Sequence, residues 1–132
     1  MGRELGTSNW HVVGQTDVDS FAAVTGDYQW IHTDPERARA SPFGTTVAHG
    51  YLTLSMAPLL LGEVISLEAF ALALNYGLDK LRFPAPLPVG RSLRMRVLLD
   101  RVEEFPGGAT LALTLIFERS GGSKPVCVAN TL

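Results

Sequence analysis

The apolar and polar positions repeat with a helical period in the first part of the chain. Apolar side chains three residues apart, beginning at Val18, share one face and predict a helix over residues 16–26. Thr16 is expected to cap the start of this helix, and Gly26 to end it. The segments before and after are expected to be, in order, a loose leader over residues 1–9, a short strand over 10–14 and a loop over 27–33.

Two further helices are expected before the period changes. Asp34 and Pro35 suit the cap and the first position of a short helix over residues 34–40. An almost wholly apolar stretch then predicts a long helix that starts at Thr45 or Thr46 and runs toward Ser66. A helix that is apolar nearly all round is buried by its neighbours on most sides.

After residue 67 the pattern changes to that of β-strands. Alternation is clearest over residues 92–102, and the prolines of residues 84–90 place an edge or a crossover before it. The Gly107-Gly108 pair predicts a turn. The expected strands cover residues 69–76, 78–83, 92–102, 110–119 and 125–131. Helices followed by antiparallel strands indicate an α+β fold, with one sheet curling around the long apolar helix in a single domain over residues 1–132.

Composition narrows the possible partners of the protein. The formal charge of the 132-residue chain is -2, which gives no footprint for nucleic acid or for an anionic membrane. No stretch is apolar and long enough to span a membrane, and no secretory signal is visible at the start. Cys127 is the only cysteine, which favours a reducing, cytoplasmic location and a small buried side chain rather than a nucleophile.

Asp27 and His32 are the strongest candidates for chemistry. They lie five residues apart in the expected loop after Gly26. A carboxylate and an imidazole are the side chains best suited to moving protons near neutral pH, and such a loop can bring both onto one water molecule. On spacing alone, an Asp that caps a turn and a surface His explain the pair as well.

The start of the long helix offers a second feature. The first turn of a helix has unpaired N–H groups and a positive dipole end, and Gly50 has no side chain to block an approaching carbonyl oxygen. Gly50 could equally serve close packing. His49 could be a base, a ligand or a packed residue at the helix start. The spacing of His32-Thr33-Asp34 fits no recognised zinc pattern, so we expect no metal.

Three ordered segments resemble one family, the MaoC-like or (R)-specific enoyl-CoA hydratases. In the first, the residues that match the family pattern are Thr25, Gly26, Asp27, Ile31, His32 and Ala38. The second covers residues 42–50 and the third residues 81–90, so that the resemblance spans about residues 17 to 100. Gln29-Trp30 stands where Asn-Pro is commonest, which is similar to a branch with nodulation-protein-N-like members.

The resemblance implies a hot-dog fold and reversible hydration of a trans-2-enoyl-CoA to an (R)-3-hydroxyacyl-CoA. It implies that Asp27 and His32 hold the water and that the Gly50 N–H meets the charge on the thioester oxygen. It also implies a homodimer with a continuous sheet and needs no cofactor. The candidates for binding the substrate are Trp30, Asn75, Tyr76 and Arg82, with Lys80 and Arg91 as further candidates for the phosphates of CoA.

Two alternatives remain open from the sequence. A hot-dog thioesterase would share the fold and the CoA chemistry, but it usually relies on a carboxylate in the central helix. Glu63, near the far end of the expected helix, is the only one there. A non-catalytic acyl-binding module would not need Asp27 and His32. The sequence leaves open the acyl chain length and which of the pair is the base.

Overall fold

The strands form one antiparallel sheet, as the alternating pattern predicts. The computed structural model describes residues 2–66 and 72–132. Within these ranges six strands pair in the order β1-β4-β5-β6-β3, and β2 pairs with β4 beside β1. Their bounds are Arg3–Thr7 (β1), His11–Val12 (β2), Leu78–Arg82 (β3), Ser92–Phe105 (β4), Gly108–Arg119 (β5) and Cys127–Thr131 (β6).

The long β4–β5 hairpin supplies the centre of the core. Leu93, Met95 and Val97 alternate along β4 with partly exposed residues, and all three are fully buried. Phe117 lies opposite Met95 in the register and is buried on the same face. Gly107 turns the hairpin with a φ of 91°, which is a conformation that glycine adopts without strain. The turn predicted from Gly107-Gly108 is therefore confirmed.

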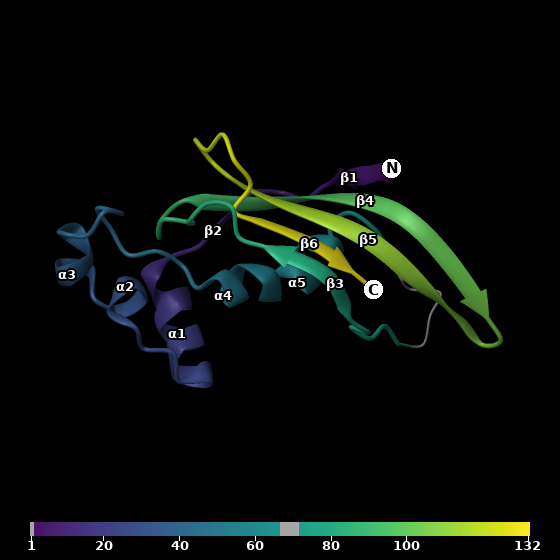
Figure 1. Ribbon diagram of the computed structural model, residues 1–132, viewed down its shortest axis with the longest axis horizontal. Coiled ribbons are helices and arrows are strands. Elements are labelled where there is room, and N and C mark those ends of the chain that lie inside the picture. The colour runs from purple at the N-terminus through teal and green to yellow at the C-terminus, as the bar shows by residue number, and fades with distance from the viewer. Residues whose placement is uncertain (1, 67–71) are drawn as a thin grey trace.

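Within the described residues, five helices lie on one side of the sheet (Figure 1). Their bounds are Gln15–Thr25 (α1), Trp30–Thr33 (α2), Pro35–Arg39 (α3), Gly50–Ser55 (α4) and Ala57–Leu61 (α5). The sheet curves over α4 and α5, where Leu60 is fully buried, while α1, α2 and α3 gather beyond one end of the sheet. The α+β class is confirmed, and no helix in the described ranges has the length and hydropathy of a membrane span.

The apolar helix is shorter than predicted, and it begins later. It starts at Gly50 instead of Thr45 or Thr46, and it is divided at Met56. Residues 46–48 are extended because they pair with residues 87–89: Ala48 N–H donates to Leu87 and the N–H of residue 89 donates back to residue 46. This pairing joins segments forty residues apart, and a local hydrophobic pattern carries no trace of it.

The start of the chain is ordered, contrary to the expected loose leader. β1 pairs with β4 over four residues of each strand, and Ser8 extends the contact by accepting from the Met95 N–H at 2.9 Å. The segment is mainly polar, with Leu5 packed against the core, and its backbone hydrogen bonds to β4 hold it in place. A pattern of apolar residues could not reveal it.

Three smaller expectations also change. Gly14 and not Thr16 stands at the start of α1, with the Asp17 carboxylate accepting from the Gly14 N–H at 2.9 Å. The expected loop over residues 27–33 contains the single turn of α2. Residues 72–76 form no strand within this chain and are exposed, and the rest of the strand predicted over 69–76 lies outside the described residues.

Candidate active site

The end of α1 sets the position of Asp27. Gly26 adopts a left-handed conformation with a φ of 81°, and its N–H donates to the Ala22 carbonyl at 2.8 Å, as the cap prediction requires. The chain therefore leaves the helix sharply. The Asp27 carboxylate then accepts from the Gln29 N–H at 3.3 Å, which steadies the short turn before α2. The Asp27 side chain remains half exposed.

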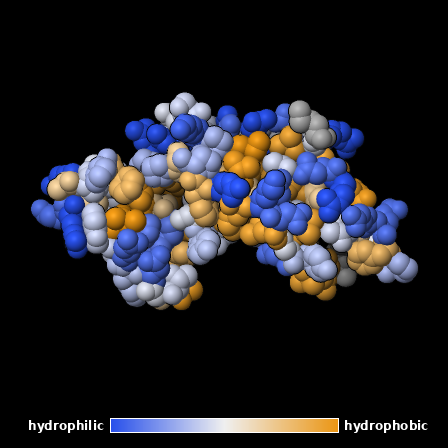
Figure 2. Space-filling model, viewed as in Figure 1, coloured by the Kyte–Doolittle hydropathy of each residue, from blue (hydrophilic) through white to orange (hydrophobic). Residues whose placement is uncertain are grey.

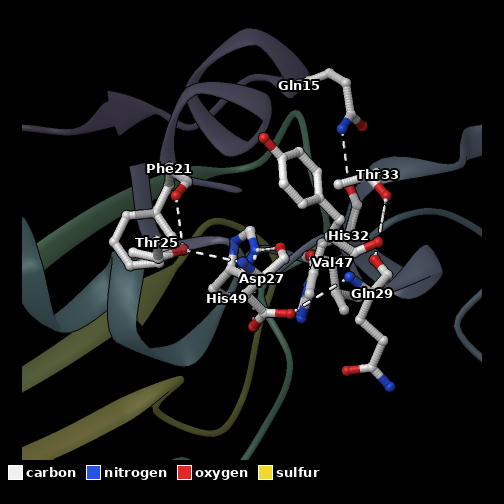
Figure 3. A network of polar contacts seen from close by, with 10 residues as sticks. Gln15, Phe21, Thr25, Asp27, Gln29, His32, Thr33, Val47 and His49 are labelled. Carbon is white, nitrogen blue, oxygen red and sulfur yellow. Dashed lines mark hydrogen bonds and ion pairs between the residues drawn. The ribbon is translucent and has the colours of Figure 1, made fainter. Parts of the chain in front are cut away.

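His32 lies on α2 and is buried, with one ring nitrogen already engaged. Its Nδ1 lies 2.6 Å from the carbonyl oxygen of Val47 (Figure 3). A carbonyl can only accept, so Nδ1 carries the hydrogen and Nε2 of the neutral ring holds the free lone pair. The backbone thus prepares the other nitrogen of His32 to take a proton.

The partner of His32 is itself fixed by the extended segment 46–48. The Val47 N–H donates to the Ile31 carbonyl at 3.0 Å, so this segment is bonded to α2 as well as to residues 87–89. The amide of Gln15 joins the same elements: it donates to the His32 carbonyl at 2.8 Å and accepts from the Thr46 hydroxyl at 2.7 Å. Sequence reasoning missed Gln15, and no local motif marks it.

His49 completes the cluster from the opposite side. The residue is 3% exposed, and its Nε2 lies 3.0 Å from the backbone oxygen of Asp27. The rings of His32 and His49 stack with their centroids 3.9 Å apart and their planes 25° apart. Figure 3 shows Asp27, His32 and His49 gathered at one point, as the expected loop geometry requires for the first two.

Asp27, His32 and His49 each offer a possible ligand atom within 4.8 Å of the others, which is the arrangement of a candidate metal site. The ring geometry does not fit an ion. A metal lies in the plane of each imidazole that binds it, whereas two stacked rings direct their lone pairs along separate planes. Nδ1 of His32 and Nε2 of His49 already donate to carbonyl oxygens, so neither can bind an ion. The nitrogens left free are Nε2 of His32 and Nδ1 of His49. The spacing leaves room for a water molecule between the polar atoms of the cluster.

Gly50 begins α4. The structure explains the glycine by close packing and not by the need to admit a carbonyl oxygen. A Cβ atom at Gly50 would lie 2.9 to 3.0 Å from three atoms of the Phe83 ring, which is closer than real contacts allow. The Phe83 ring also meets Tyr51 edge-on at 6.2 Å. The packing explanation for this glycine is thus supported, and its N–H still belongs to the unpaired first turn of a helix.

A comparison with protein-family models adds the decisive observation. The model described as MaoC like domain matches residues 1–112 of the 132 in the chain. The chain belongs to the MaoC-like family. The motif around Asp27 and His32, together with residues 42–50 and 81–90, lies within the matched part.

Relatives of this MaoC-like chain carry related names. The 3-hydroxyacyl-thioester dehydratase Z of Mycobacterium tuberculosis is 47% identical over 99% of the chain and 87% of the relative. Nodulation protein N of Rhizobium leguminosarum bv. viciae is 40% identical over 98% and 83%. The (R)-specific enoyl-CoA hydratase of Aeromonas caviae is 31% identical over 82% and 77%.

Solved structures agree with the fold. The (R)-hydratase from A. caviae superimposes with a TM-score of 0.79 at 24% identity, covering 98% of this chain and 92% of that one. A MaoC-like dehydratase from Rhodospirillum rubrum gives 0.77 at 23% identity, over 99% and 88%. The MaoC-like chain therefore has the predicted hot-dog fold.

The expected substrate-binding residues of the MaoC-like chain lie in different places. The Trp30 ring packs against the Arg37 guanidinium, 4.4 Å away, on the α2–α3 side. Asn75 and Tyr76 are exposed in the segment that precedes β3. Arg82 ends β3 and precedes Phe83, whose ring lies against Gly50 at the start of α4.

Two other potentially reactive side chains of the MaoC-like chain, Glu63 and Cys127, have structural roles. The Glu63 carboxylate accepts from the Asn9 N–H at 3.0 Å and pairs with His11 at 2.7 Å, so it ties the N-terminal segment down. Cys127 is fully buried, and burial raises the pKa of its thiol to about 12. The structure thus supports the apolar reading of Cys127.

Proposed function

We propose that the protein is a hydro-lyase that adds water reversibly to a trans-2-enoyl-CoA and yields an (R)-3-hydroxyacyl-CoA. The observation that carries the proposal is the closeness of the Asp27 carboxylate and the His32 imidazole, since one carboxylate oxygen and one ring nitrogen lie within 4.8 Å of each other. That separation leaves room for one water molecule that both groups can hold. The names of the relatives support the same class of reaction.

His32 acts as the base in the hydration direction. Because Val47 accepts from Nδ1, the Nε2 lone pair is the one free to take a proton from the water. The water oxygen then bonds to the β-carbon, and the electron pair of the alkene moves toward the thioester oxygen. A proton reaches the α-carbon by way of Asp27, with His32 as its source. The site then ends in the protonation state in which it began.

The N–H of Gly50 stabilises the charge on the thioester oxygen. The first N–H groups of a helix lack acceptors within the helix and point outward from its positive end. A hydrogen bond aimed at the developing enolate acts most strongly in the transition state. No metal or organic cofactor takes part in this proposal, because the thioester itself makes the β-carbon electrophilic.

The thioesterase alternative has weaker support. The carboxylate that it would need is Glu63, which is paired with His11 and lies on the N-terminal side of the sheet. A non-catalytic acyl-binding role would leave the free Nε2 of His32 and the adjoining Asp27 carboxylate without a use. Both alternatives predict that no water is added to the double bond, so one assay separates them from hydration.

We further propose that the protein is a homodimer. Leu72, Leu74 and Tyr76 are 68%, 79% and 80% exposed, next to the edge strand β3. Figure 2 shows apolar side chains over the middle of one face and at the end where this segment lies. An exposed apolar stretch beside an unpaired strand edge is suited to pairing with a second copy. Pairing there would extend the sheet.

We also propose that the protein is a single domain, that Arg82 contacts the substrate and that the protein is cytoplasmic. One apolar core contains buried residues from β4, β5, β6 and α5, which supports a single domain over residues 1–132. Arg82 is the candidate for contacting the CoA phosphates, and Trp30, Asn75 and Tyr76 remain candidates for contacting the rest of the substrate. A cytoplasmic location follows from the single cysteine, which gains nothing from an oxidising compartment.

A panel of trans-2-enoyl-CoA thioesters of increasing chain length tests the function. Loss of the absorbance of the conjugated thioester reports hydration, and release of free CoA thiol reports hydrolysis. We expect loss of absorbance without thiol release. Thiol release from saturated acyl-CoA would establish the thioesterase instead, and binding without either change would establish the acyl-binding module.

A further inference from the structure

His49 is a buried polar residue that the proposed acid–base pair leaves without a role. It stands at the start of α4 and is in contact with three parts of the site. Nε2 lies 3.0 Å from the Asp27 backbone oxygen and 4.0 Å from its Oδ2, and the ring stacks on His32 and lies 4.9 Å from the Phe21 ring. One side chain thus contacts both members of the pair.

The contact with Asp27 determines where His49 carries its hydrogen. A backbone carbonyl only accepts, so Nε2 of His49 must be the protonated nitrogen. The lone pair of the neutral ring then falls on Nδ1. That atom is buried and has no hydrogen-bond partner among the residues that the structure describes.

The unpaired Nδ1 indicates that the imidazole is present for its other nitrogen, Nε2, which donates a hydrogen bond. A buried acceptor without a partner is costly, and a phenyl ring would fill the same space and make the same stack without that cost. What the imidazole adds is the Nε2–H group on Asp27. A hydrogen on Nδ1 as well would be a second buried N–H, and it would have no acceptor among the described residues.

We propose that His49 is a positioning residue for the hydration reaction, an inference that rests on the proposed function. Its Nε2–H fixes the backbone of the turn that contains Asp27. The Asp27 carboxylate itself accepts one hydrogen bond, from the Gln29 N–H. The ring of His49 supports the face of His32 and so holds the imidazole that takes the proton in place. His49 does not exchange protons with the substrate.

Two matched variants separate the hydrogen bond from the ring. His49→Phe keeps the stack and the volume but removes the donor, whereas His49→Gln keeps an N–H of similar reach but removes the ring. We expect His49→Phe to lower kcat by up to about 10²-fold, which is the cost of a small misplacement of a catalytic group. KM should stay unchanged, and the melting temperature should stay unchanged or rise. His49→Gln should recover part of the lost kcat.

A purely structural role predicts the opposite result. In that case His49→Phe, the better packed variant, would retain wild-type kcat and His49→Gln would lose both stability and activity. The pathway through Asp27 is tested in the Asp27→Asn background, where His49→Phe should change kcat by no more than about twofold because the two losses share one cause. Full multiplication of the two losses would overturn the proposal.

A spectroscopic measurement tests the geometry without turnover. Two-bond correlation spectra of ¹⁵N-histidine-labelled protein, assigned with His49→Phe, should show His49 protonated at Nε2 and bare at Nδ1. The opposite tautomer would overturn the inference even in an active enzyme. Lack of turnover of every thioester by the wild type would refute the proposed function and this role together, whereas an active wild type with an unimpaired His49→Phe refutes the role alone.

Discussion

The carbonyl oxygen of Val47 accepts a hydrogen bond from Nδ1 of His32 at 2.6 Å. This contact leaves Nε2 as the only basic atom of the ring and fixes the plane in which it lies. An extended segment before a helix therefore decides how a histidine on another helix can act. The proposed assignment of His32 as the base, which the sequence leaves open, rests on this single relationship.

Removing either member of the acid–base pair should abolish most activity. Asp27→Asn and His32→Ala should each lower kcat by about 10²–10⁴-fold, the usual contribution of a general acid or base. Asp27 is half exposed, so its variant should keep the wild-type stability. His32→Asn is the matched control, because its amide can still donate to Val47 while it lacks Nε2. Activity within twofold of wild type in any folded variant would refute the assignment.

The N–H of Gly50 can be tested apart from its packing. Gly50→Ala should lose stability, because the new Cβ would meet the Phe83 ring, and Phe83→Leu should relieve that loss. In the Phe83→Leu background, Gly50→Pro removes the N–H from a first helical position that tolerates proline, and the preceding His49 already has an extended ψ of 137°.

We expect Gly50→Pro to lower kcat by about 10²–10³-fold relative to Gly50→Ala in that background. Equal kcat values for the two folded double variants would mean that the N–H takes no part in the reaction. Far-ultraviolet circular dichroism checks that both retain the helix.

The product should be the (R) alcohol, and chelators should have no effect. A fixed helix start and a fixed Asp27 turn expose one face of the alkene to the water held by His32, so one stereoisomer should dominate. Chiral chromatography of the product measures this. Mainly (S) product, or activity that is lost with chelator and restored by zinc, would mean that the mechanism is wrong.

The protein should sediment as a homodimer. Leu74→Lys combined with Tyr76→Lys places charges on the exposed segment beside β3 and should shift the protein to monomer. Val102→Lys, at a residue on β4 that is 47% exposed, is the matched control and should remain dimeric. A wild-type monomer at micromolar concentration in sedimentation velocity experiments would contradict the prediction.

Cys127 should resist thiol reagents until the protein unfolds. Burial raises the pKa of the thiol to about 12 from an ordinary value of 9.0. Above pH 9 the unfolded chain loses a proton that the folded chain keeps, so Cys127 makes the free energy of unfolding fall as pH rises. Urea unfolding at pH 8 and pH 10 should show a smaller decrease for Cys127→Ala. An equal decrease in both proteins would contradict this.

Local pattern was enough to predict much of the fold and the closeness of Asp27 and His32. The left-handed cap at Gly26 and the Asp34 cap of α3 depend on residues close in sequence, and the alternation in β4 and β5 depends on a buried face. These features appear in the chain itself. Asp27 and His32 lie in one short segment, so their proximity could also be predicted.

The remaining features depend on contacts between distant segments. The late start of α4 follows from the pairing of residues 46–48 with 87–89, and β1 follows from its pairing with β4. The role of Gln15 depends on His32 and Thr46, both distant in sequence. The contact of the Trp30 ring with Arg37 joins α2 to the next helix, α3, and the local pattern does not predict it.

The pairing of residues 46–48 with residues 87–89 also bears on the order in which the candidate site can assemble. The segment that carries Val47 joins residues 87–89 by closing a loop of some forty residues, and closing it costs chain entropy that local helix formation does not. The isolated N-terminal helices could form early and still hold a histidine with no fixed tautomer. We therefore expect the contact between Val47 and His32 to be fixed late in folding, when the sheet captures the segment that carries Val47.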